Sequence, residues 1–493
     1  MPEHSFLFLR NGSAAPWDSV PELPFAQFRR EILDRMNTAV RLEAFFAVPE
    51  TDGSFRLTAV LGDSEQHGFL LSKSRVRSRF ESLTAEHPAF NRFEREIHEL
   101  HGLVPLGHPW LKPLRFPRGE PGVTDYFTMQ GDPVHEVAVG PVHAGVIEPG
   151  HFRFECMGET VYSLEISLGY QHRGVEKLLI GGPDARTPHL IETAAGDSSI
   201  AAALNYAQIM EALGNVKVDA PARKLRQIAL ELERCANHIG DLGALAGDVA
   251  FLPAASFCGR IRGEYLNMTA ELCGNRFGRN FIAPGGVRQA VGRSRLNQIR
   301  SRLDRVSGEL WNALDLMFDA PTVLDRFENT GTVSAAAAGQ LGMAGLAARA
   351  SGLDMDARRD FPVNGADAVN AMGEKPYLAG DVLARARMRY LELRDSHDFL
   401  FRTLADPPEC PAAERGKIRL MPEQIALSVT EAWRGENCLA VLTGPDGKIR
   451  AAKLVDVSFH NWEGLALALR DEQISNFPIC NKSFNLSYCG HDL

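Results

Sequence analysis

The side chains best suited to proton chemistry lie in residues 140–154, a segment dense in glycine, proline and ionisable groups. It contains His143, Glu148 and His151. Glu148 stands between isoleucine and proline, an apolar setting that raises the pKa of a carboxyl group and suits it to carry protons near neutral pH. A simpler interpretation stays open, in which Glu148 and His151 cap a turn or pair with Arg153.

Metal-binding patterns are weak. No two of the eight cysteines form a C-x-x-C pair, and their scatter through apolar segments favours buried thiols over disulfides or an iron–sulfur cluster. His98, His101 and His108 are closely spaced, but no carboxylate and cysteine set completes a site around them. We therefore expect these histidines to be structural.

Bulk properties indicate a globular chain of at least two domains. Its 493 residues exceed one typical core, and its hydrophobic content of 45% is ordinary for a folded protein. A net charge of -9 gives no broad cationic surface, so nucleic acid is not an expected partner. No apolar run approaches the roughly 20 residues that span a bilayer, and the start of the chain lacks the pattern of a signal peptide. Contact with a membrane would come through partner subunits.

The first part of the chain is typical of a small α/β domain. Residues 42–48 and 54–61 are strand-like and flank an Asp-Gly turn, which predicts an antiparallel hairpin. Residues 89–102 predict a helix with phenylalanine, isoleucine and leucine on one face and Gly102 as its stop. The glycine- and proline-rich stretch from 119 to 135 is the expected linker.

The second part is mainly helical. Apolar spacing predicts one long helix over 187–213 and another that starts at Asp219, an N-cap followed by proline in the first turn. Further helices are expected over 296–320, within 333–350 and over 380–404. Short strands at 439–444 and 449–457, joined by a Pro-Asp-Gly turn, predict a terminal β ribbon.

Three strings give a family resemblance: GPVHAGVIEPGH from residue 140, LGYQHRG from 168 and ELERCANH from 231. They resemble the nickel-iron hydrogenase large subunit and the quinone-site (D-type) subunit of respiratory complex I, most closely the formate hydrogenlyase type with a fused C-type domain. The resemblance implies an α+β fold: a C-type α/β scaffold domain over 1–130, then a mainly helical hydrogenase-like body with terminal β ribbons over 131–493.

The resemblance also implies that the nickel site has been lost. The hydrogenase family holds nickel and iron with two cysteine pairs, because soft thiolates suit these metals. Ala195 and Ser198 stand at the first pair, and Ser487 and Gly490 at the second. Cys489 is displaced by one residue, which turns its side chain away. Such hydrogenases usually carry a C-terminal extension that is cleaved after metal insertion, and we expect none here.

Other pocket elements remain in altered form. Arg434 stands in a segment that resembles the basic loop near the metal in hydrogenases and the quinone cavity in complex I. The quinone-binding tyrosine of complex I would align near Gly196, and the neighbouring Asp197 either replaces it as a polar group or caps a helix. The candidate catalytic residues are therefore His143, Glu148, His151, Asp197 and Arg434.

The functional expectation is a subunit of a membrane-associated, complex I-like oxidoreductase whose metal-free pocket binds quinone or couples electron transfer to proton movement. This chain would bind no cofactor, and iron–sulfur clusters would lie in partner subunits. The expected partners are an iron–sulfur small subunit and antiporter-like and quinone-channel-like membrane subunits, at the cytoplasmic side of the inner membrane. Two alternatives are an active nickel-iron hydrogenase with an unusual ligand set, and a non-catalytic bridge between soluble and membrane arms.

Overall fold

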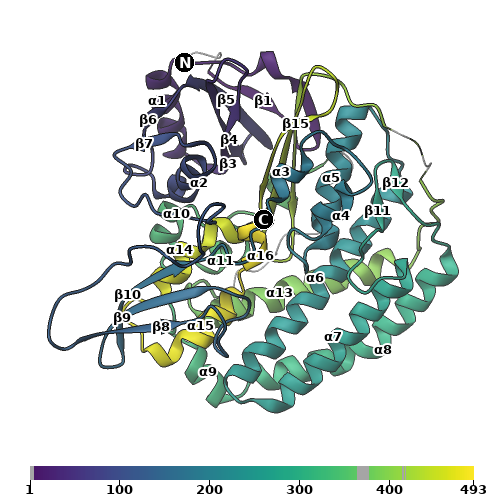
Figure 1. Ribbon diagram of the computed structural model, residues 1–493. Helices are drawn as coiled ribbons and strands as arrows, with labels where there is room; N and C mark the ends of the chain where they lie inside the picture. Colours follow the sequence, from purple (N-terminus) through teal and green to yellow (C-terminus); the bar gives the residue numbers. More distant parts are fainter. Residues whose placement is uncertain (1–4, 364–376, 414–415, 417) are drawn as a thin grey trace.

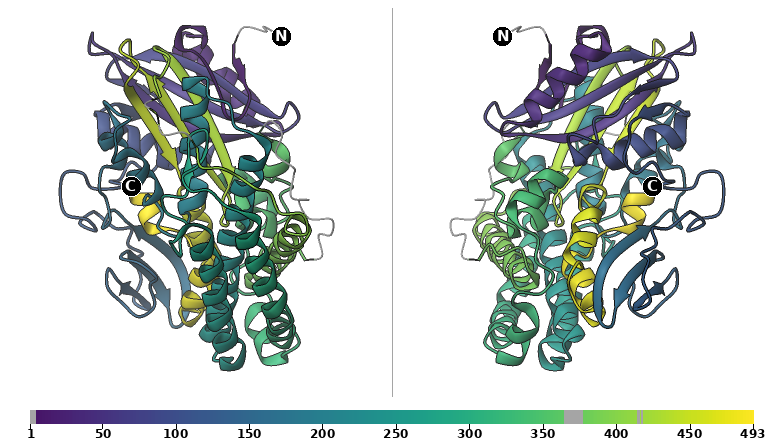
Figure 2. Two further views of the ribbon diagram at one scale, coloured as in Figure 1. Left: turned by 90° about the vertical axis from the view of Figure 1, so that its right-hand side faces the viewer. Right: turned by 90° about the vertical axis from the view of Figure 1, so that its left-hand side faces the viewer.

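The computed structural model describes residues 5–363, 377–413, 416 and 418–493. An N-terminal α/β unit lies at one end, and long helices form the other (Figure 1). Figure 2 shows the C-terminal helices between the long helices and a small three-stranded sheet. The chain thus combines helix and strand layers, as an α+β fold requires.

The N-terminal sheet is antiparallel, in the order β1-β5-β4-β3. The predicted hairpin is confirmed, since β3 and β4 pair along their whole length around the Asp-Gly turn. Helices α1 and α2 pack on this sheet, and α2 ends at Gly102 in the left-handed conformation that favours glycine. The elements are β1 (Leu7–Leu9), β3 (Val40–Pro49), β4 (Phe55–Asp63), β5 (Gly68–Val76), α1 (Phe25–Met36) and α2 (Asn91–His101).

A second four-stranded sheet joins the two ends of the chain, in the order β15-β14-β13-β2. Strand β2 (Ser13–Pro16) pairs antiparallel with β13 (Gln424–Glu431). The predicted ribbon is the hairpin of β14 (Glu436–Thr443) and β15 (Ile449–Val455). The ribbon does not end the fold, because three helices follow it: α14 (Ser458–Ala468), α15 (Phe477–Phe484) and α16 (Tyr488–Asp492).

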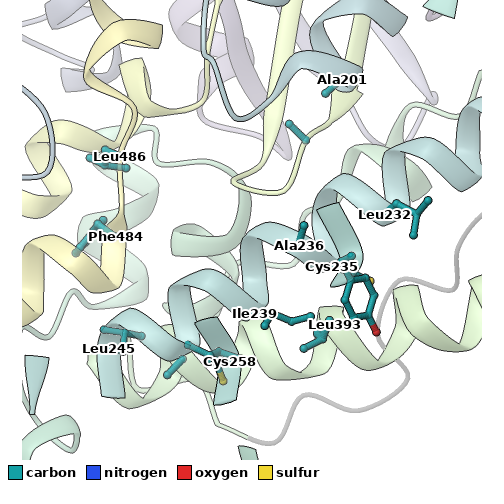
Figure 3. Close-up of a cluster of buried hydrophobic side chains, with 14 of the residues drawn as sticks. Ala201, Leu232, Cys235, Ala236, Ile239, Leu245, Cys258, Leu393, Phe484 and Leu486 are labelled. Carbon is teal, nitrogen blue, oxygen red and sulfur yellow. The ribbon is translucent and has the colours of Figure 1, made fainter. Parts of the chain in front are cut away.

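The helical body is built on α6, which carries the predicted N-cap: Asp219 accepts the N–H of Ala222. Its apolar face forms the largest core with α7, α8 and α13. Figure 3 shows part of this core, where Cys235 and Ile239 of α6 lie beside Leu393 of α13. The helices are α5 (Ser199–Gly214), α6 (Ala220–Asp248), α7 (Leu252–Cys273), α8 (Arg293–Phe318) and α13 (Val382–Thr403).

The prediction of one helix over 187–213 is wrong. Helix α4 (Thr187–Glu192) ends before residues 193–198, and α5 starts at Ser199. The buried carboxylate of Glu233 accepts the N–H groups of Ile200 and Ala201, so the first turn of α5 is satisfied from another helix. Residues 196–198, Gly-Asp-Ser, lie in the break, and Ser198 occupies the N-cap position of α5.

The remaining elements are short. Residues 333–350 form two short helices, α10 (Ala335–Leu341) and α11 (Gly345–Ala350), separated where Gly342 adopts a positive φ. The others are β6 (Arg79–Glu81), β7 (Val104–Leu106), β8 (Val134–Val139), β9 (His151–Met157), β10 (Thr160–Ser167), β11 (Ile282–Ala283), β12 (Gly286–Val287), α3 (Val175–Leu179), α9 (Pro321–Phe327), α12 (Ala357–Asp360), and single 3-10 turns at Trp17–Ser19, Pro88–Phe90 and Ile474–Asn476.

The cysteines and the clustered histidines make local structural contacts. All eight cysteines are free thiols, seven of them buried. His98 and His108 bond to the backbone carbonyls of Leu103 and Asn91, and His101 lies against Phe55. These histidines therefore help to hold the N-terminal unit together.

Candidate functional site

The centre of the site is an ion pair between Asp197 and Arg434. Asp197 lies in the α4–α5 break, and Arg434 lies in the turn between β13 and β14. Two parallel hydrogen bonds join them, Nη1 to Oδ1 and Nη2 to Oδ2, each 2.7 Å long. The Arg434 side chain is 5% exposed and that of Asp197 is 35% exposed. Arg434 is thus buried, and its charge is balanced by a carboxylate that still reaches the surface.

Neighbouring groups fix both partners. The backbone carbonyl of Asp197 accepts hydrogen bonds from Trp433 Nε1 (3.1 Å) and Asn237 Nδ2 (2.9 Å). Arg434 lies over the Trp433 ring, 4.0 Å from its centroid, and its Nε donates to the carbonyl of Asn485. The pair is therefore held in one geometry by both the β13–β14 turn and α6.

Glu148 reaches the same site from the segment before β9. Its two carboxylate oxygens lie 3.3 Å from the backbone nitrogens of Tyr488 and Cys489, at the start of α16. Burial raises the pKa of Glu148, and the charge of Asp197 raises it further while Arg434 lowers it. Glu148, Asp197 and Arg434 thus interact electrostatically.

The two predicted histidines do not join this group. His143 is exposed, and its Nδ1 accepts the N–H of Gly145. His151 is half-buried; its Nδ1 lies 3.4 Å from the carbonyl oxygen of Gly140, and its ring lies against Tyr126. Burial lowers the pKa of His151, so the ring is mostly neutral at pH 7. The side-chain partners described for them, Gly145, Gly140 and Tyr126, all lie outside the Asp197–Arg434 group.

The positions expected for nickel ligands do not suit a metal. Ser487 Oγ caps α16 by accepting the N–H of Gly490, and it lies 3.4 Å from Cys489 Sγ. A Cβ atom at Gly490 would come within 2.9 Å of Asp456, so a cysteine does not fit there without rearrangement. Ala195 offers a methyl group, and Ser198 a hard hydroxyl.

The wider neighbourhood supports the same conclusion. Among the described residues, no group of three or more histidine, cysteine or acidic side chains could hold a metal ion. Burial raises the pKa of Cys489, which keeps its thiol protonated and a poor ligand. The donor set that nickel and iron need is therefore missing from the described part of the site.

Glu233 is a member of this site that was not predicted from the sequence. It is 7% exposed on α6, and burial raises its pKa to about 8 even though two backbone N–H groups bond to it. Together with Asp197 and Asn237 it lines a void of about 10 Å³. The sequence did contain one signal for it. Ala229 and Ala236 lie four residues before and three residues after Glu233, so this acidic residue lies on a face of α6 that otherwise carries small residues.

A larger cavity of about 560 Å³ lies elsewhere, between α5, α6, α12 and β13. Its volume is that of a small-molecule site. It shares no lining residue with the void beside Asp197. Beside Asp197 this chain thus leaves room for about one water molecule.

The fold and this site define a protein built from the two domain types of respiratory complex I. Residues 27–128 match the family of the 30 kDa subunit of respiratory-chain NADH dehydrogenase, and residues 248–425 match the family of its 49 kDa subunit. The chain thus carries domains of both complex I families, and its homologues include a formate hydrogenlyase subunit and a membrane-bound hydrogenase subunit.

The individual relatives include hydrogenase-type proteins and a subunit of an NADH-quinone oxidoreductase. Formate hydrogenlyase subunit 5 of Escherichia coli (strain K12) is 26% identical over 84% of this chain and 76% of its own length. A carbon monoxide-induced hydrogenase of Rhodospirillum rubrum is 29% identical over 71% of this chain and 97% of its own. The fused C/D chain of the NADH-quinone oxidoreductase of Bacteroides fragilis is 27% identical over 70% of this chain and 72% of its own.

A solved structure has the same fold. A chain of the membrane-bound sulfane sulfur reductase, an archaeal respiratory membrane complex, matches with a TM-score of 0.68 at 21% identity. The match covers 73% of this chain and 98% of that one. Within the described residues, no helix is both long and apolar enough to span a membrane.

Proposed function

We propose that this chain is a subunit of a membrane-associated, complex I-like respiratory oxidoreductase, in which a metal-free pocket couples electron arrival to proton movement. The relatives that span most of the chain belong by name to hydrogenases and NADH-quinone oxidoreductases. The observation that carries the proton role is the Asp197–Arg434 ion pair beside Glu148, at the place where hydrogenase relatives are expected to hold nickel.

The proposed chemistry is a charge-compensating proton transfer. An electron that arrives beside the pocket adds negative charge there, which raises the proton affinity of nearby carboxylates. Glu148 takes up this proton, because burial has already raised its pKa. A proton on Asp197 would weaken its bond to Arg434 and free the guanidinium for another anion or carbonyl group.

The assembly expected around the chain follows from the same family. We propose an iron–sulfur small subunit as the neighbour that delivers electrons, with antiporter-like and quinone-channel-like membrane subunits below, at the cytoplasmic side of the inner membrane. This chain itself would hold no cofactor. A quinone would need walls from a partner, because the void beside Asp197 is only about 10 Å³.

A first experiment separates this proposal from an active hydrogenase. Nickel would be measured by elemental analysis of the purified complex, normalised to this chain, together with hydrogen uptake using a dye acceptor. The expected result is neither nickel nor hydrogen uptake. Stoichiometric nickel with uptake would overturn the proposal and would mean that Cys489, Ser487 or Cys480 is a ligand after all.

A second experiment separates it from a purely structural bridge. Glu148→Gln removes the titrating carboxyl group. It keeps a polar side chain of the same size next to the backbone N–H groups at the start of α16. Proton movement per electron should fall at least severalfold in the assembled complex, and the complex should still assemble. Glu136→Gln, a surface change in an ion pair with Arg153, is the matched control. Unchanged coupling in Glu148→Gln would favour the structural bridge.

A further inference from the structure

We infer that Glu233 is a second proton-carrying carboxyl, which exchanges protons with Asp197 from the side of α6 and α7. This inference rests on the proposed proton role of the Asp197–Arg434 site. It concerns a residue with no part in the predicted nickel pocket, and it gives the site a route to solvent that is separate from Glu148.

The geometry comes from the void that Glu233 shares with Asp197. Its volume of about 10 Å³ corresponds to roughly one water molecule. Asp197 reaches the void from the α4–α5 break, and Glu233 and Asn237 reach it from α6. Asp197 and Glu233 both line this void, and the charge of Asp197 raises the pKa of Glu233, so the two carboxyl groups lie close enough to interact, and a proton can pass between them through a single water molecule. The O–H bond of Glu233 breaks as an O–H bond of Asp197 forms, and no electrons are transferred.

In the part of the chain that the structure describes, Glu233 has no dedicated counter-ion. The cation that lowers its pKa is Arg234, which points elsewhere, to Glu231 and to the carbonyls of Glu431 and Ala432. The groups that face Glu233 from the packed elements are Asp197 in the α4–α5 break, the N–H groups of Ile200 and Ala201 on α5, Asn237 on α6, Leu266 and Thr269 on α7, and Arg276 and Phe277 in the following loop.

A helix-capping role alone does not account for this residue. Ser198 already stands at the N-cap position of α5, yet its hydroxyl makes no capping bond and has no partner among the described residues. A buried carboxylate is a costly replacement for a serine cap. Glu233 therefore has a property that a serine cap lacks, which is the ability to hold and release a proton.

The void also lies close to the protein surface. Arg276 and Phe277, which also line the void, are both exposed, and Phe277 retains 41% of its surface. Asp197 is 35% exposed on its own side, and a neighbouring protein covers that side in the proposed assembly. Glu233 would then connect the covered site to solvent past the loop of residues 274–281.

The test is an infrared titration of the full chain carrying ¹³C-labelled glutamate. A protonated carboxyl band should disappear with a midpoint near pH 8 and should be missing in Glu233→Gln. Glu94→Gln is the matched control, since Glu94 is also buried and bonded to a backbone N–H but lies in the N-terminal unit. A band that persists in Glu233→Gln, or a midpoint near 4.5, would overturn the inference.

A second variant keeps the test valid if Glu233→Gln does not fold. Asp197→Asn removes the negative charge that raises the pKa of Glu233, so the midpoint of the native Glu233 band should move to lower pH. An unchanged midpoint would show that the two carboxyls do not interact. Both titrations use the isolated chain, whereas the coupling measurement on Glu148→Gln uses the assembled complex. The inference and the proposed function can therefore fail separately.

Discussion

At the scale of single residues, the site is centred on the ion pair between Asp197 and Arg434. Arg434 is buried, and a buried guanidinium without an anion is costly. With no metal cluster to face among the described residues, Arg434 receives its balancing negative charge from Asp197 through two hydrogen bonds of 2.7 Å.

The Asp197–Arg434 pair should show strong coupling in a double-mutant cycle. Asp197→Asn, Arg434→Gln and the double variant would be compared by urea unfolding. We expect a coupling free energy of about 1–3 kcal/mol, below the largest values because Asp197 is partly solvated. The exposed pair Asp446–Lys448, 3.8 Å apart, is the control and should give about 0. Equal coupling in the two pairs would contradict this prediction.

Glu233 should make the stability of the chain depend on pH. Its pKa rises from 4.5 to about 8 on folding, so between these values the folded state binds more protons than the unfolded state. Stability from this group is therefore full below about pH 4.5 and falls as the pH rises towards 8. The melting temperature of Glu233→Gln minus that of the native chain should therefore increase steadily from pH 5 to pH 8. A constant difference across this range would show that Glu233 does not titrate there.

At the scale of secondary-structure elements, the β13–β14 turn carries Arg434 and is held by close backbone packing. Gly435 in this turn has a φ of +141°, and Gly345 at the start of α11 has a φ of +65°. A Cβ atom on Gly435 would lie 2.4 Å from the Cα atom of Gly345. Two glycines are thus needed for the turn to approach α11 and direct Arg434 towards Asp197.

Gly435→Ala should therefore destabilise the protein and disturb the site. The backbone clash with Gly345 adds to the strain of a positive φ, and we expect a loss of about 2–4 kcal/mol. Gly53→Ala is the control, because Gly53 also has a positive φ, at a hairpin turn, but a Cβ atom there meets nothing within 4 Å. It should cost only about 1 kcal/mol in the same thermal or urea unfolding measurement. Similar losses in the two variants would exclude the proposed close packing.

At the scale of the whole molecule, the two ends of the chain are joined rather than arranged in series. Strand β2 completes the sheet of β13, β14 and β15. Buried charges also cross the junction: Lys453 on β15 lies 2.6 Å from Glu96 on α2, and Arg115 pairs with the same carboxylate. Helix α16 packs here as well, where the carbonyl of His491 accepts a bond from Arg115.

A cut between the expected domains should therefore not give an independent body. Expressed alone, residues 131–493 would lack β2, expose the edge of β13 and leave Lys453 without Glu96. We expect this fragment to aggregate, and co-expression with residues 1–130 to restore a soluble pair in size-exclusion chromatography. A stable, monomeric 131–493 fragment would show that the shared sheet is dispensable.

The sequence by itself determined the local elements and the family. The Asp-Gly turn between β3 and β4, Gly102 after α2 and the Asp219 cap of α6 depend on neighbouring residues only, and all three were predictable. The motif around Glu148, and the absence of cysteine at the expected nickel-ligand positions, can likewise be recognised in short stretches of sequence. These features could be predicted because backbone conformation and ligand chemistry are local properties.

Only the tertiary structure decided which groups form the site. Asp197 and Arg434 are 237 positions apart, and their pairing depends on the packing of the β13–β14 turn against the α4–α5 break. Glu233, on another helix, accepts the N–H groups of the first turn after the break, and its burial there raises its pKa. Burial and electrostatic contact arise from residues far apart in the chain, so no local pattern could separate Glu148 from His143 and His151, which stay with their own segment.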